Sequence, residues 1–174
     1  ENKKVRALRY TDRKLLMGTT TGINVIDFMS ARVLQFNNLF NLANNPVYSI
    51  EVDKNGFIWA GTWRGGILRF KINNNQLTDT LLLNSAPGSK FRLSSNQVNF
   101  LLYDHSKNEL LAGTNYGLNR IILDDSGNIH EIVYYRGNNS ETSLSSEYIW
   151  PIVKQNDSVY WLGTLGGGLN KVTL

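Results

Sequence analysis

The 174-residue sequence has no cysteine, only three prolines and a charged fraction of 18%. Without cysteine the chain has no disulfide framework and no cysteine-based metal site. The low charge content and the many asparagines, including the run 73–75, favour short strands joined by turns over long salt-bridged helices. The hydrophobic fraction of 41% is enough for one domain with a core of its own.

Long apolar runs are missing as well. No segment approaches the roughly 18 consecutive apolar residues of a membrane span, so we expect no direct membrane insertion of this segment. The sequence opens with "ENKKVRALRY", without a methionine and without a signal peptide. We therefore expect it to be a processed or excised piece of a longer protein.

The basic residues are unevenly distributed. The net charge is +4, and six of the 18 lysines and arginines fall within the first 14 positions. Such a cluster can indicate a nucleic-acid or membrane surface. Because the other basic residues are scattered and the cluster has no helical stripe, we interpret it as a solvated face and expect no nucleic-acid partner.

A Gly-Thr pair occurs four times, beginning at residues 18, 61, 113 and 163, with intervals of 43, 52 and 50 residues. Periods of this size are typical of propeller blades or of helical arrays. Between the pairs lie runs of four to seven residues rich in Val, Ile, Leu, Phe or Trp, separated by turn-forming residues, and no helical stripe is sustained. The sequence therefore predicts an all-β fold, a β-propeller.

Each unit is predicted to contain four antiparallel strands, as a propeller blade does. We place the four blades at 5–36, 47–83, 98–135 and 149–174, the last without its fourth strand, so that the whole is a partial propeller. The glycine of each Gly-Thr pair is expected to allow close packing between blades. Strands follow these pairs, whereas a phosphate-binding loop would need a helix N-terminus, so we interpret the pairs as architecture.

The second copy, "VYSIEVDKNGFIWAGTWRGGILRF" (47–70), resembles the two-component regulator propeller repeat. That pattern runs Val, Ile, Asp, Gly, apolar-Trp, Gly-Thr, Gly-Gly and Leu. The other copies depart from it, since Leu16 and Leu111 replace the tryptophan and Thr11 and Gln155 replace the aspartate. The resemblance implies a fragment of the periplasmic sensor region of a Bacteroidetes hybrid two-component system. It also implies an oligosaccharide ligand and a histidine kinase that is not present in this chain.

No constellation of catalytic residues emerges, and we expect no catalytic residue, no metal site and no cofactor. His105 and His130 lie in different parts of their units. Asp53 and Asp104 occupy equivalent turn positions, which marks them as turn formers. No nucleophile lies beside a base. Two other carboxylates fall in a loop that we expect to face a ligand: Glu141 and Glu147.

Binding is better supported, because one turn varies while the repeat around it is constant. The turn after the second strand carries Trp63 and Arg64 in the second copy, and Asn115 and Tyr116 in the third. Aromatic faces stack on sugar rings, and Arg and Asn supply directed hydrogen bonds or pair with acidic groups. The alternative is that Trp63 packs on a neighbouring blade.

A second candidate set is the residue that follows the first apolar position of each inner strand. If that strand lines the central channel, these four side chains point inward or surround its mouth; ordinary packing between blades is the alternative. The four residues are Arg6, Tyr48, Asn99 and Trp150. Two long polar connections also separate the blades, and their shared Leu-Ser-Ser segments (93–95 and 144–146) are expected to be structural.

Three functions remain open. The first is a non-enzymatic sensor module that perceives an oligosaccharide. The second is a protein-interaction propeller with Trp63, Tyr116 and Trp150 as hot-spot aromatics. The third is a propeller-type polysaccharide lyase or hydrolase.

The ends of the repeat array are expected to be uncovered, because the last copy lacks a fourth strand and both terminal blades lack a neighbour. Exposed edges and faces drive association. We therefore expect an open arc that pairs with a second copy as a homodimer, or that continues into further blades of the same chain.

Overall fold

The structure is a computed structural model, and it describes residues 4–37, 45–137 and 143–174. Within these ranges the chain forms fifteen β-strands and no helix, so none of these residues belongs to a helix that could cross a membrane. The strands form four antiparallel sheets, and in each sheet consecutive strands are neighbours. The predicted all-β propeller fold is confirmed: three sheets have four strands and the last has three.

We call these sheets blades 1 to 4. Blade 1 contains β1 (Val5–Thr11), β2 (Lys14–Thr19), β3 (Gly22–Asp27) and β4 (Arg32–Asn37). Blade 2 contains β5 (Val47–Val52), β6 (Ile58–Thr62), β7 (Ile67–Asn73) and β8 (Gln76–Leu83). Blade 3 contains β9 (Val98–Asp104), β10 (Glu109–Thr114), β11 (Gly117–Leu123) and β12 (Ile129–Tyr135). Blade 4 contains β13 (Ile149–Lys154), β14 (Val159–Thr164) and β15 (Gly168–Thr173).

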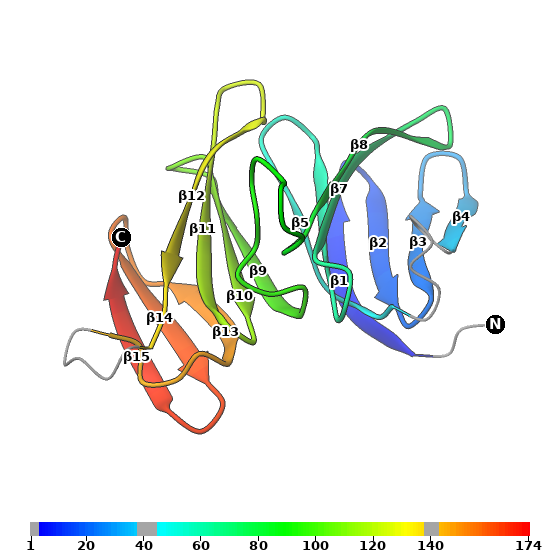
Figure 1. The fold of residues 1–174 in the computed structure, drawn as a ribbon. Helices are drawn as coiled ribbons and strands as arrows, with labels where there is room; N and C mark the ends of the chain where they lie inside the picture. Colours follow the sequence, from blue (N-terminus) through cyan, green and yellow to red (C-terminus); the bar gives the residue numbers. More distant parts are fainter. Residues whose placement is uncertain (1–3, 38–44, 138–142) are drawn as a thin grey trace.

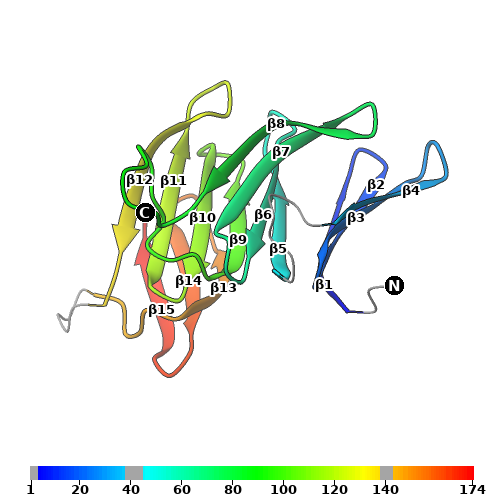
Figure 2. The ribbon, with the colours of Figure 1, turned by 45° about the vertical axis from the view of Figure 1, so that its right-hand side comes forward.

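The blades follow one another around an arc (Figures 1 and 2), and their inner strands pack side by side in chain order, β1 on β5, β5 on β9 and β9 on β13. The hairpins β3–β4, β7–β8 and β11–β12 project upward in Figure 1. At the other end every inner strand begins, and the turns between second and third strands also lie there. We call this the starting end, and the other the opposite end.

The hydrophobic core lies between the blades. Three clusters of buried side chains occur, one for each interface between successive blades. At the interface of blades 2 and 3, for example, Trp59 and Ile67 of blade 2 are buried against Val98, Leu101 and Tyr103 of β9. A four-stranded sheet cannot cover both of its faces alone, so each blade depends on its neighbours for burial.

The glycines of the Gly-Thr pairs make this contact possible. A β-carbon on Gly61 would lie 2.8 Å from Cγ1 of Val98, the first residue of the next inner strand. The same relation holds between Gly18 and Val47 (2.8 Å) and between Gly113 and Cγ2 of Ile149 (2.9 Å). Only a residue without a side chain lets two sheets approach this closely, so the predicted role of these glycines in packing is confirmed.

The threonines of the pairs close their own turns. The Thr62 hydroxyl donates a hydrogen bond to the Gly66 carbonyl (2.9 Å), and the Thr114 hydroxyl donates one to the Gly117 carbonyl (2.8 Å). Gly66 has a φ of 82°, and a β-carbon there would collide with the Leu83 carbonyl. The frame of each turn is therefore set by its threonine and glycine, whatever residues lie between them.

The Leu-Ser-Ser segments are structural, as predicted. The Asn119 side-chain amide accepts a hydrogen bond from the Ser94 backbone N–H (2.8 Å) and donates one to the Ser94 hydroxyl (2.7 Å). Asn170 makes the same two bonds with Ser145, at 3.0 and 2.7 Å. In blades 3 and 4, an asparagine on the third strand thus holds the chain in place before it enters the inner strand of that blade.

Both terminal blades leave apolar side chains uncovered. On β1 these are Val5, Leu8 and Tyr10, which are 50%, 62% and 63% exposed. They occupy the positions that Val98, Leu101 and Tyr103 use on β9 to pack against the preceding blade. On blade 4, Leu169 is 65% exposed, whereas its counterpart Leu118 is fully buried by the following blade.

Asp104 fastens blade 3 to blade 4. Its buried carboxylate accepts hydrogen bonds from the Lys154 ammonium (2.8 Å), from the Tyr160 hydroxyl and from Ser106. Burial alone would raise the pKa of Asp104, but the bonds from Lys154, Tyr160 and Ser106 outweigh it and hold the pKa well below its usual range. Asp104 is therefore more than the turn former that its position predicted.

Replacing Gly61 with alanine should destabilise the protein by about 1 to 3 kcal/mol, because the new methyl group overpacks the interface against Val98. Urea unfolding at constant pH measures the change. In the double variant Gly61→Ala, Val98→Ala the space is restored, so its loss should be smaller than the sum of the two single losses. Additive losses would show that the two residues do not compete for the same volume.

Replacing Asp104 with asparagine should cost roughly 2 kcal/mol at neutral pH, less than the roughly 3 to 5 kcal/mol for a fully buried ion pair, because the Lys154 side chain is 25% exposed. The pKa of Asp104 is lower in the folded state than in the unfolded state. Its contribution is therefore present above about pH 4, the ordinary pKa of aspartate, and is lost as the pH falls toward the depressed value.

Chemical denaturation between pH 7 and pH 2 should thus show the difference between wild type and Asp104→Asn shrinking in acid. Asp157→Asn is the matched control, because Asp157 lies 3.6 Å from the same ammonium with its side chain 95% exposed, and it should have little effect. A stability difference that is independent of pH would contradict the assignment.

Candidate functional site

A β-bulge or a similar irregularity interrupts the strand pairing near the start of every inner strand. The pairing register shifts between Val5 and Ala7 in blade 1, between Val47 and Ser49 in blade 2, and where Val98 gives way to Phe100 in blade 3. In blade 4 it shifts between Ile149 and Ile152. Bulged residues leave the regular ladder and turn their side chains in a new direction. The residues at these bulges include the four candidates Arg6, Tyr48, Asn99 and Trp150.

Three of these four side chains, those of Arg6, Tyr48 and Trp150, lie together with Trp63 of the variable turn. The Tyr48 ring centroid lies 5.2 Å from that of Trp63 and 6.2 Å from that of Trp150, the latter in an edge-on arrangement. The Arg6 guanidinium lies over the Tyr48 ring, 4.8 Å from its centroid. We call Arg6, Tyr48, Trp63 and Trp150 the aromatic cluster. It joins residues of blades 1, 2 and 4 at the starting end.

The aromatic cluster is accessible. Trp150 is 37% exposed, Arg6 is exposed, and Tyr48 and Trp63 are half-buried. The ring of Trp63 packs against Tyr48 of its own blade. Two hydrogen bonds hold its turn: the Trp63 N–H donates to the Pro46 carbonyl (3.0 Å), and the Arg64 N–H donates to the side-chain oxygen of buried Asn45 (2.8 Å). The indole is therefore presented by a fixed backbone.

The fourth bulged residue, Asn99, is buried at 2% exposure. Its amide nitrogen donates to the Asn115 side-chain oxygen and to the Ile149 carbonyl, both at 2.9 Å. Asn115 in turn donates to the Gln97 side chain (2.5 Å). The structure thus brings Asn99 and Asn115 together in a network that fastens blade 3 to blade 4, which matches the packing alternative for this position.

The remaining candidates lie outside the aromatic cluster. The Arg64 side chain is exposed beside Trp63. Tyr116 is 47% exposed, and its ring is covered by the Arg136 guanidinium, 4.7 Å from the centroid. Arg136 also lies 5.6 Å from the Tyr134 ring. Sequence reasoning missed Arg136, Tyr134 and Asn45; only the shared position of Arg136 and Tyr116 at the starting end could have pointed to this pairing.

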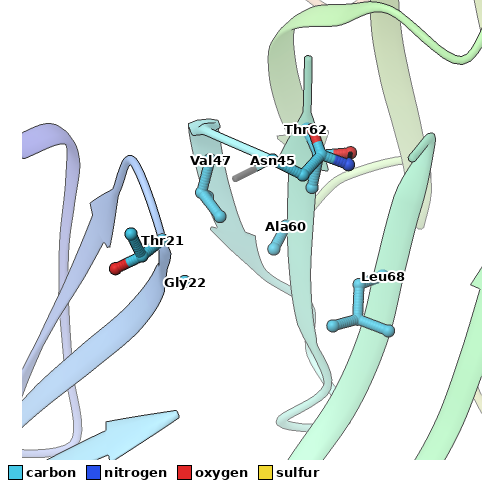
Figure 3. Close-up of a pocket in the computed structure, with 7 residues that line it drawn as sticks. All are labelled: Thr21, Gly22, Asn45, Val47, Ala60, Thr62 and Leu68. Atoms are coloured by element: carbon cyan, nitrogen blue, oxygen red, sulfur yellow. Dashed lines mark hydrogen bonds between the residues drawn. The ribbon is translucent and has the colours of Figure 1, made fainter. Parts of the chain in front are cut away.

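Two hollows lie near these residues. A small cavity of about 10 Å³ lies between blades 1 and 2, which is room for about one water molecule. Figure 3 labels the residues that line it. Its polar lining consists of Thr21, Asn45 and Thr62. A larger, open hollow of about 330 Å³ lies along blade 4 between Trp150 and Leu165. The small cavity is too small for a sugar, whereas the open hollow adjoins the aromatic cluster through Trp150.

The titratable groups do not assemble into a catalytic arrangement within the described residues. Asp53 accepts hydrogen bonds from the Trp59 indole (2.8 Å) and from the backbone of its own turn, so it is a turn former as predicted. His105 packs edge-on against Tyr103 at the opposite end, and His130 is exposed on β12. No group of three potential metal ligands occurs in the part of the chain that the structure describes. Glu141 lies outside the described residues.

Comparisons with known proteins agree with this architecture. The model of the two component regulator propeller family matches residues 41–64, which include β5, β6 and the Trp63 turn. A search of the curated proteins finds no match.

Among solved structures, a similar one is the extracellular domain of a protein described as a hybrid two-component system of B. thetaiotaomicron. It is 25% identical with a TM-score of 0.70, over 99% of this chain and 21% of that one. A second such domain from the same organism is 21% identical with a TM-score of 0.56, over 97% of this chain and 27% of that one. Virginiamycin B lyase from Staphylococcus aureus shares the fold at 19% identity and a TM-score of 0.65, over 99% of this chain and 57% of that one.

The chain therefore spans about a fifth of the length of the first of these structures. Since two of the three are extracellular domains, the likeness is consistent with an extracytoplasmic location. The resemblance seen in the sequence is confirmed: the second blade carries a two-component regulator propeller repeat, in a segment shaped like the extracellular sensor domains of hybrid two-component systems.

Proposed function

We propose that this segment is a non-enzymatic, ligand-sensing part of a hybrid two-component sensor, located in the periplasm, and that its ligand is an oligosaccharide. The observation that carries the proposal is the aromatic cluster. Three aromatic rings from two blades meet an arginine from a third at the starting end, and Trp150 and Arg6 remain exposed. Rings of this kind stack on the apolar faces of sugars, while the guanidinium binds hydroxyl or acidic groups.

The cluster also suits a sensor because it crosses blade boundaries. A ligand in contact with Arg6, Tyr48 and Trp150 touches blades 1, 2 and 4 at once. Its affinity then depends on how these blades are placed relative to one another, which is the condition for passing a binding event onward. The kinase that would receive the signal lies outside this chain, and the relay is part of the proposal.

Catalysis is not part of the proposed function. The hydrogen-bonding capacity of Asp53, Asp104 and Asp124 is used by their own turns and by Trp59, Lys154 and Tyr160. In the described residues, no carboxylate or histidine shares the aromatic cluster.

Replacing Trp63 with alanine should weaken oligosaccharide binding by about 2 kcal/mol, roughly thirtyfold, because the ring supplies a stacking face that backbone hydrogen bonds hold in place. Calorimetric titration of the 174-residue chain with a panel of soluble oligosaccharides measures the effect. Phe28→Ala is the matched control, since Phe28 is a 57% exposed aromatic in the turn between β3 and β4 at the opposite end, and it should leave affinity unchanged.

Equal affinity of wild type and a correctly folded Trp63→Ala, Arg64→Ala variant would remove this turn from the site. Cleavage products in the same mixtures would favour the polysaccharide lyase or hydrolase alternative. If no oligosaccharide bound, the proposed function would be wrong, and the interaction-scaffold alternative would gain support.

We further propose that the two uncovered faces are completed by blades of this same repeat. Val5, Leu8 and Tyr10 match the side chains that pack on a preceding blade, and Gly163 and Leu169 match the positions that receive a following one. Because the chain covers 21% of the similar sensor domain, such blades belong to the rest of a longer chain. In the isolated segment, a second copy presents an equivalent blade.

The isolated 174-residue chain should therefore self-associate at micromolar concentration, and Leu8→Glu should shift it toward monomer, because it places a charge where the next blade would pack. Light scattering after size exclusion determines the mass. Glu131→Lys is a suitable control, since it changes an exposed charge on an outer strand away from both faces. A stable wild-type monomer would mean that four blades suffice alone, and the arc interpretation would be wrong.

A further inference from the structure

Charge is segregated between the two ends of the propeller. Every aspartate of the chain and three of its described glutamates lie in the half toward the opposite end. These residues are Asp12, Asp27, Asp53, Asp79, Asp104, Asp124, Asp125, Asp157, Glu51, Glu109 and Glu131. At the starting end, Glu147 is the single described carboxylate, while Lys4, Arg6, Arg64 and Arg136 are all exposed there. The connection 84–97 adds exposed Lys90 and Arg92.

The ion pairs among the described residues lie in the half toward the opposite end. Toward the opposite end, Lys54 pairs with Asp125 at 2.9 Å and Lys154 pairs with Asp104 at 2.8 Å. No described carboxylate forms an ion pair with Arg6, Arg64 or Arg136. Among the described residues, the charges of these three arginines are therefore not balanced by an ion pair, and they create a potential that attracts anions.

Two of these arginines are held against aromatic rings. Arg6 lies over Tyr48 at 4.8 Å, and Arg136 lies over Tyr116 at 4.7 Å. A guanidinium stacked on a ring keeps its edge N–H groups free for a carboxylate or sulfate, which it binds in a bidentate manner. Beside Arg6, the rings of Trp63 and Trp150 offer faces for a sugar. The arrangement matches a ligand that has both an apolar ring face and an acidic group.

We infer that the aromatic cluster recognises an acidic oligosaccharide, one whose sugar rings carry carboxylate or sulfate groups, with Arg6 as the residue that selects the acidic group. This inference rests on the proposed function and narrows it from oligosaccharides in general to negatively charged ones. The stacked rings contribute affinity for any sugar of suitable shape, whereas Arg6 discriminates between a charged ring and its neutral counterpart.

The test pairs each acidic probe with a neutral one of the same shape. The 174-residue chain is titrated with uronate-containing tetrasaccharides, beginning with tetragalacturonate, and with sulfated tetrasaccharides. Each is compared with its carboxyl-reduced or desulfated form. We expect an acidic probe to bind at least tenfold more tightly than its neutral form, with an affinity that falls as salt increases. The two acidic sets show whether carboxylate or sulfate is the preferred group.

Arg6→Gln should weaken binding of the acidic probe by about tenfold and binding of the neutral form by less than about twofold, because only the charged group loses its partner. Arg32→Gln is the matched control: it removes the same charge from an exposed arginine of blade 1 at the opposite end, and affinity should stay within about twofold. Arg6→Lys should recover only part of the loss, since lysine lacks the bidentate geometry. Urea unfolding confirms that each variant is folded.

The outcomes separate the two proposals. Preferred binding of neutral oligosaccharides, lost in Trp63→Ala but not in Arg6→Gln, would overturn the acidic ligand and leave the proposed function intact. Absence of binding to every probe would overturn both. Equally tight binding of single-stranded DNA or of phosphatidylglycerol vesicles would show a general attraction for polyanions, and would overturn recognition of an acidic sugar.

Discussion

The contact on which this structure depends is the one between the last glycine of a second strand and the first branched residue of the next inner strand. Gly18 contacts Val47, Gly61 contacts Val98, and Gly113 contacts Ile149. In each pair the distance is too short for a β-carbon on the glycine. Because both partners recur at fixed positions in the repeat, every sheet meets the next at the same point. The inter-blade cores, and with them most of the buried apolar surface, follow from that fixed approach.

The same contact determines where the candidate site lies. The residue after each branched residue lies at the bulge of the inner strand. In blades 1, 2 and 4 its side chain joins the aromatic cluster at the starting end, whereas in blade 3 it is buried. The framework is the same in every blade, but the bulged residues differ: an arginine, a tyrosine, a buried asparagine and a tryptophan. A repeating scaffold thereby produces a surface without repeating chemistry, which is what selective binding requires.

The fold was predictable because its signals are local and recur four times. The strand runs and the Gly-Thr pairs lie within each unit, and the packing role of Gly61 followed from its position. The site was only partly predictable. The sequence identified Arg6, Tyr48, Trp63 and Trp150 as candidates, but not that Tyr48 would touch a tryptophan two blades away, because such a contact depends on the angle between sheets.

Asn99 shows that a position in the repeat does not by itself predict whether a side chain is exposed. It occupies the same bulge as Tyr48, yet the neighbouring Asn115 and the Ile149 carbonyl draw its amide inward. Equivalent positions in a repeat therefore do not imply equivalent exposure. Asp104 likewise looked like Asp53 in the sequence, and its bonds to Lys154 and Tyr160 come from a blade that lies more than forty residues further along the chain.

Because each core is shared between two blades, the blades cannot fold as independent units. Blades 2 and 3 have a partner on both sides, whereas blades 1 and 4 have a partner on one side only. Resistance to local opening is therefore graded along the chain, with a protected middle and two labile ends. Whatever covers an end blade also completes its folding, so for these two blades assembly and folding are a single event.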